Sequence, residues 1–151
     1  MSAGPAGKLY TPDLLSLATQ LARFPLSDEF SFWAQERSRT CGSTIELGVA
    51  HDRLGLVSGV GLKVSACAIG QASAAIMAMH LVGTKADQAI TMEPAIAAWL
   101  VGEGTLPDWP GFDALAPALP HKGRHDALIL PWRALSRALS NPPLSKAPES
   151  S

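Results

Sequence analysis

The sequence has little charge of either sign. Charged residues make up 17% of the 151 residues, and the formal net charge is -1. With so small a net charge, the chain has no basic face that would attract nucleic acid or an anionic membrane surface. We therefore expect no nucleic-acid partner and no membrane partner.

Long apolar runs and cysteines are also scarce. The most apolar run, residues 64–79, is rich in alanine and interrupted by Gln71 and serines, so it is too short and weakly apolar to span a bilayer. The chain opens without the pattern of a secretory signal. Two cysteines without an export signal indicate reduced thiols in a cytoplasmic protein rather than a disulfide framework. A glycine-rich phosphate loop and a C-x-x-C pair are both missing.

The length fits one domain that buries a sizeable core. We expect this domain to cover residues 9–139. Residues 1–8 are mostly glycine, alanine and serine, and residues 140–151 are rich in proline and serine, so both ends should be poorly ordered.

The middle of the chain predicts an antiparallel hairpin. Apolar and polar residues alternate over 43–50 and again over 56–64, and residues 51–55 supply a polar turn between them. Cys41 precedes the first strand and Cys67 follows the second. Because a hairpin returns to its starting end, the two cysteines should lie at the same edge of the sheet.

Helices are expected on both sides of this hairpin. Thr11 is a suitable N-cap for a helix that ends near Phe24, and Cys67 precedes a helix of small residues. The segment 32–39 is only weakly strand-like, and the proline-rich segment 104–120 is expected to be a loop. Proline is unwelcome inside a helix, so we place Pro131 in the first turn of the last one.

Three polar stretches are the candidate site. They are Cys41-Gly42-Ser43, Cys67, and Arg124-His125-Asp126 ahead of the last helix. Two cysteines at one edge suit a soft metal or a cluster, and imidazole or carboxylate can complete the ligand shell. A structural interpretation also stays open, with Cys67 as a packed core thiol and Asp126 as the cap of a solvated helix start.

The order of these motifs resembles the U-type iron–sulfur cluster scaffold family, which includes the NifU N-terminal domain, IscU and SufU. Three stretches between about Leu9 and Leu139 carry the resemblance: Cys41-Gly42 before the hairpin, Ala66-Cys67-Ala68-Ile69-Gly70-Gln71-Ala72, and Arg124-His125-Asp126-Ala127-Leu128-Ile129-Leu130-Pro131-Trp132. The resemblance implies an α+β fold in which a small antiparallel sheet of about three strands packs against several helices.

The resemblance further implies a scaffold rather than an enzyme. Members of the family build a 2Fe-2S-type cluster on three cysteines, take sulfur from a cysteine desulfurase and pass the cluster to apo-protein acceptors. Cys41 and Cys67 match the first two cysteines and would bind the cluster or iron. Ser43 stands at the family's aspartate position and Ala127 at its third cysteine position.

The missing third cysteine leaves several hypotheses open. Asp126 or His125 would supply the missing ligand, or a dimer or client protein would donate it, and we expect a monomer or weak dimer. A degenerate scaffold fold kept as an interaction module is an alternative. Another is a zinc-binding domain, since zinc accepts Cys, His and Asp together. A thiol enzyme that uses Cys67 has no supporting motif.

Overall fold

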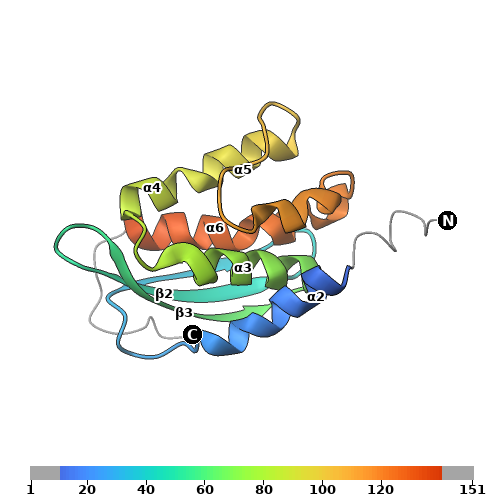
Figure 1. Cartoon of the computed structure of the whole chain (residues 1–151). Coiled ribbons are helices and arrows are strands. Elements are labelled where there is room, and N and C mark those ends of the chain that lie inside the picture. Colours follow the sequence, from blue (N-terminus) through green and yellow to red (C-terminus); the bar gives the residue numbers. More distant parts are fainter. Residues whose placement is uncertain (1–10, 141–151) are drawn as a thin grey trace.

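A three-stranded antiparallel sheet with strand order β1-β2-β3 forms the base of the fold (Figure 1). The structure is a computed structural model that describes residues 11–140, so the expected disorder of residues 1–8 and 141–151 lies outside it. The strands are β1 (Phe32–Arg37), β2 (Thr44–His51) and β3 (Val57–Ser65). The predicted hairpin is confirmed as β2 and β3, and the weakly strand-like segment proves to be β1.

Five α-helices cover one face of this sheet within the described part of the chain (Figure 1). They are α2 (Pro12–Thr19), α3 (Ala68–Leu81), α4 (Ala86–Ile90), α5 (Met92–Leu100) and α6 (His125–Ser140). Helices α3 and α6 lie against the strands and against each other, and α4 and α5 pack on α6. The α+β fold with a small sheet under several helices is therefore confirmed. None of the helices in the described residues is long and apolar enough to cross a membrane.

The turn between β2 and β3 is organised by one carboxylate. Oδ1 of Asp52 accepts hydrogen bonds from the backbone N–H groups of Leu54 (2.9 Å) and Leu56 (3.0 Å). This is the local pattern by which aspartate stabilises turns. Next to the turn, the pairing register shifts between Ala50 and His51.

Pro131 lies inside α6, so its predicted place in the first helical turn was wrong. A proline there removes one helical hydrogen bond, which tertiary contacts offset. The buried Ser73 hydroxyl of α3 donates to the Leu128 carbonyl (2.6 Å) and accepts from Nε1 of Trp132 (2.9 Å), and these two partners flank Pro131 in α6. The expected loop 104–120 also differs, because it contains a 3-10 helix at Phe112–Ala118 that buries Phe112.

The sheet face away from the helices is covered by the segment before β1. A Cβ added to Gly48 or Gly61 would lie only 2.7 Å from atoms of the Phe30 ring. At Gly61 it would also collide with the carbonyl oxygen of Pro25. Trp33 donates from Nε1 to the Phe30 carbonyl (2.6 Å), which fixes the segment in place. The Phe30 ring therefore packs directly on the backbone of Gly48 and Gly61, where any side chain would collide with it.

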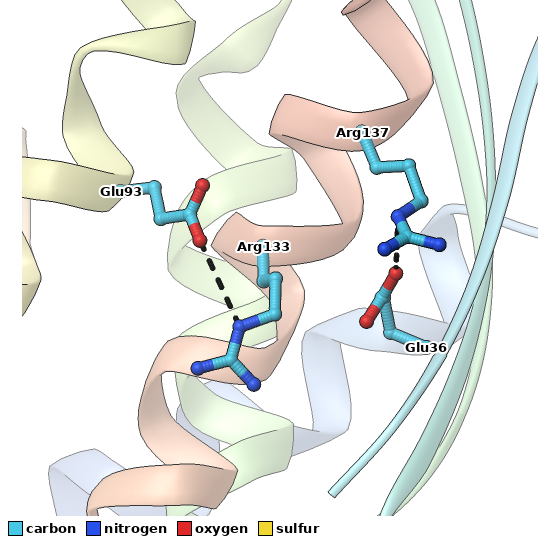
Figure 2. A network of polar contacts seen from close by, with 4 residues as sticks. All are labelled: Glu36, Glu93, Arg133 and Arg137. Atoms are coloured by element: carbon cyan, nitrogen blue, oxygen red, sulfur yellow. Dashed lines mark ion pairs between the residues drawn. The ribbon is translucent and has the colours of Figure 1, made fainter. Parts of the chain in front are cut away.

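Two ion pairs connect α6 to its neighbours (Figure 2). Nε of Arg133 lies 3.7 Å from Oε2 of Glu93 in α5, and Nε of Arg137 lies 2.7 Å from Oε2 of Glu36 in β1. That oxygen of Glu36 is buried, and its charge is compensated by the Arg137 guanidinium.

Candidate functional site

The hairpin brings the two cysteines to one end of the sheet. Thr44, the first residue of β2, pairs with Ser65, the last residue of β3. Cys41 lies three positions before Thr44 and Cys67 lies two positions after Ser65. The expected placement at a common edge is therefore confirmed by the strand register.

Cys41 lies in the loop between β1 and β2, surrounded by hydroxyl groups. The Ser38 N–H donates to the Ser43 carbonyl (2.8 Å), which closes the loop. Gly42 has a φ of 75°, a left-handed conformation that glycine adopts at low cost. The Sγ atom of Cys41 lies 3.2 Å from the Ser38 hydroxyl and 3.0 Å from the Ser43 hydroxyl. The thiol is exposed and hydrogen-bonded at the same time.

The hydroxyl groups around Cys41 change the pKa of its thiol. The hydrogen bonds with Ser38 and then Ser43 lower the pKa of Cys41 below its ordinary value. Partial burial and the nearby Asp126 carboxylate act in the opposite direction but do not cancel the effect. A lowered pKa leaves more thiolate near neutral pH, and the thiolate is the form that binds metal or attacks an electrophile.

A pH titration of alkylation tests this environment. In the wild type, Cys41 should react with iodoacetamide with a midpoint below that of an ordinary cysteine. Ser43→Ala removes a hydroxyl that stabilises the thiolate, so the midpoint should move to higher pH. Mass spectrometry separates the alkylated Cys41 peptide from the peptide that contains Cys67. An unchanged midpoint in Ser43→Ala would contradict the role given to this hydroxyl.

Asp126 is tied to the same loop. Its Oδ2 accepts hydrogen bonds from the hydroxyls of Ser38 (3.0 Å) and Thr40 (3.1 Å). Asp126 lies in the first turn of α6, so these bonds join the start of that helix to the loop that carries Cys41. The structure thus places one of the two proposed auxiliary ligands beside the first cysteine.

Cys67 is the N-cap residue of α3. Its side chain is half-buried and makes no capping hydrogen bond to the helix. The first turn of α3 faces Ala127, because a Cβ added to Gly70 would lie 3.3 Å from the Cβ of Ala127. The side chain of Ala127 is buried. The position of the missing third cysteine therefore lies against the turn that begins at Cys67.

The His125 side chain is hydrogen-bonded outside the Cys41 loop. Its Nε2 lies 2.7 Å from the carbonyl oxygen of Leu119, with which it is hydrogen-bonded. Across residues 11–140, no group of three or more His, Cys, Asp and Glu side chains is arranged closely enough to hold a metal ion. The ligand roles of Cys41, Cys67, Asp126 and His125 remain predictions.

Two residues of this site escaped the interpretation of the sequence. Ser38 and Thr40 both contact Asp126, and Ser38 also contacts Cys41. The signal was present as two hydroxyl residues, three positions and one position before Cys41. Their common target, Asp126, is more than eighty residues away in the chain, and only the fold brings it near.

The fold and this end of the sheet define a class of protein: a small α+β domain with a thiol pair where its hairpin ends. No protein-family model matches the sequence, and no curated protein matches it. Solved structures do. The N-terminal part of a nitrogen-fixing NifU-like protein from Brucella abortus is 27% identical, with a TM-score of 0.82, over 90% of this chain and 95% of that one.

Two further structures share the fold. A candidate iron–sulfur cluster assembly scaffold protein for the SUF system of Fervidobacterium islandicum AW-1 is 21% identical, with a TM-score of 0.78, over 87% of this chain and 97% of that one. A hypothetical protein is 19% identical, with a TM-score of 0.62, over 83% and 98%. The chain therefore has the fold of the U-type scaffold family, and the resemblance seen in the sequence is confirmed.

Proposed function

We propose that this chain is an iron–sulfur cluster assembly scaffold. Its cargo would be iron or a 2Fe-2S-type cluster, bound through Cys41 and Cys67 with Asp126 as the auxiliary ligand. The observation that supports this most directly is the convergence at one end of the sheet. Cys41 lies in a loop bonded to Asp126, and Cys67 begins the helix turn that contacts Ala127.

The donor set suits such cargo. Thiolates are the usual ligands of iron–sulfur clusters, and other side chains replace them in some clusters. Asp126 is the better auxiliary candidate, because its carboxylate is already held beside Cys41 by Ser38 and Thr40. For His125 to bind through Nε2, that atom would first have to leave the Leu119 carbonyl. A partner or a second copy of the chain would supply any remaining ligand.

The family role also suggests partners and a location. A scaffold of this kind would receive sulfur from a cysteine desulfurase and give its cluster to apo-proteins. It would work in the cytoplasm as a monomer or weak dimer, and it would carry cargo rather than catalyse a reaction. The partners and the scaffold role are suggested by the fold shared with the NifU-like and SUF-system structures. The cytoplasmic location is suggested by two cysteines in a sequence without an export signal.

One observation favours a second candidate function. The described residues hold no ready group of three ligands, and Ala127 replaces a thiolate in the family pattern. A chain with such a site would serve as an interaction module of the assembly machinery without building clusters. The zinc-binding alternative would need further ligands from a partner or a second copy of the chain.

Anaerobic reconstitution with ferrous iron and sulfide separates these functions. The wild type should develop the visible absorption of a thiolate-bound cluster, and Cys41→Ser or Cys67→Ser should lose most of it because each removes one of two thiolates. Ser58→Ala, an exposed change on β3, is the matched control and should behave as wild type.

The negative outcomes are equally informative. A wild type that develops no absorption would refute cluster binding. About one zinc per chain in purified protein, lost in Cys41→Ala, would then indicate the zinc-binding alternative. Purified protein that binds neither iron nor zinc would support the function of an interaction module.

A further inference from the structure

The hydroxyl of Ser38 lies between Cys41 and Asp126. It donates to Oδ2 of Asp126 at 3.0 Å, and the Sγ atom of Cys41 lies 3.2 Å from the same oxygen. Ser38 is only 3% exposed, so water has little access to this hydroxyl. One buried oxygen atom therefore contacts both a proposed thiolate ligand and the proposed auxiliary carboxylate.

The same hydroxyl also shapes the loop. The backbone N–H groups of Thr40 and Cys41 each point to Oγ of Ser38 at 3.3 Å. A serine hydroxyl has one hydrogen to donate and two lone pairs that accept. With the hydrogen directed to Asp126, the Ser38 oxygen accepts hydrogen bonds from the loop and from the Cys41 thiol, and the Ser43 hydroxyl is the one that can donate to a Cys41 thiolate. Ser38 thus bonds the turn that carries Cys41 on one side and α6 on the other.

This arrangement replaces a residue that the sequence lacks. A carboxylate two positions after Cys41 would be held near the thiol by its own short loop, but Ser43 stands there. The carboxylate in the network instead comes from α6, a different element that packs on β1 and β2, and the hydroxyls of Ser38 and Thr40 are its hydrogen bonds to the loop of Cys41.

We propose that Ser38 is a positioning residue, which holds Asp126 beside Cys41 so that a metal ion bound by the thiolate meets the carboxylate. This inference rests on the proposed function. Ser38 itself does not bind the metal; it determines where the carboxylate lies.

A titration with Co²⁺ alone tests the proposal, because the absorption spectrum of this ion reports its ligands. Ser38→Ala should weaken binding roughly tenfold, within the range known for residues that orient metal ligands. It should also change the ligand-field bands in the same way as Asp126→Asn. Thr40→Val removes one hydroxyl from Asp126 but none from Cys41, so its effect should be smaller. Ser58→Ala should match the wild type.

A double mutant distinguishes positioning from a general structural role. If Ser38 acts through Asp126, then Ser38→Ala should cost little further Co²⁺ affinity in the Asp126→Asn protein. Additive losses, or a Ser38→Ala protein that binds as the wild type does, would overturn the proposal. Thermal unfolding of each variant shows whether the fold is retained.

Hydrogen exchange of the metal-free protein gives a result that does not depend on metal binding. Ser38→Ala should speed exchange in residues 39–43 and leave α3 protected as in the wild type. A wild type that binds no Co²⁺ would count against the proposed metal site, and exchange would then decide by itself whether Ser38 holds the loop. Unchanged exchange in residues 39–43 would refute the positioning role.

Discussion

Ala127→Cys should strengthen the cluster binding proposed for this chain. The substitution adds a third thiolate at the position that faces the first turn of α3, beside Cys67. Ala127 is buried and packs closely against Gly70, so the added sulfur should lower the free energy of unfolding by about 2 kcal/mol. After anaerobic reconstitution, the variant should lose its cluster to an iron chelator roughly tenfold more slowly than the wild type.

Ala127→Ser is the matched control for this gain. Serine has almost the size of cysteine and a much poorer ligand atom, so it should add the same steric strain without the thiolate. Iron content and the rate of chelator transfer should then stay at the wild-type level. Equal cluster retention in both variants and the wild type would show that this position does not face the cargo.

Gly61→Ala should cause the largest loss of stability among single-methyl substitutions on the sheet. The new Cβ would collide with the Pro25 carbonyl and would lie 2.7 Å from the Phe30 ring. The carbonyl belongs to the backbone and cannot rotate away, and the Leu62 N–H donates to the adjacent Phe24 carbonyl (2.9 Å). We expect a loss of about 3 kcal/mol in the free energy of unfolding. Urea denaturation measures it.

Alanine substitutions at two other glycines should lower the free energy of unfolding by smaller amounts. At Gly59 the added Cβ would lie 3.4 Å from Phe30, an ordinary contact, and at Gly123 it would meet nothing within 4 Å. Gly123→Ala should therefore change the free energy of unfolding by less than about 0.5 kcal/mol. Gly59→Ala should fall between the two. A Gly61→Ala protein as stable as Gly123→Ala would show that Phe30 and Pro25 do not pack tightly on the sheet.

Local patterns in the sequence were sufficient for the hairpin and for the helix after Cys67. Alternation of apolar residues over 43–50 and 56–64 has one physical meaning, a strand with one buried face, and the structure confirms it. The common location of the two cysteines followed from that pattern alone. Thr11 likewise caps its helix as expected, accepting from the Leu14 N–H at 3.1 Å.

The features that sequence patterns missed depend on contacts between distant segments. Pro131 is tolerated inside α6 because buried contacts with Ser73 stabilise the helix around it. The glycines on the outer sheet face looked like ordinary weak points in strands until Phe30 was placed on them. Ser38 is one serine among many until Asp126 is brought to it by the fold.

The carboxylate of Asp52, at the far end of the hairpin, has a consequence for the spacing of the two sulfur atoms. Strand β3 is nine residues long, and each residue of a strand advances about 3.4 Å. A change in turn length that slid β3 by two residues against β2 would therefore displace Cys67 by about 7 Å relative to Cys41. Asp52, Gly55 and the register shift after Ala50 select one alignment of the strands. The turn therefore helps to set the spacing of the two cysteines, although it lies at the opposite end of the hairpin.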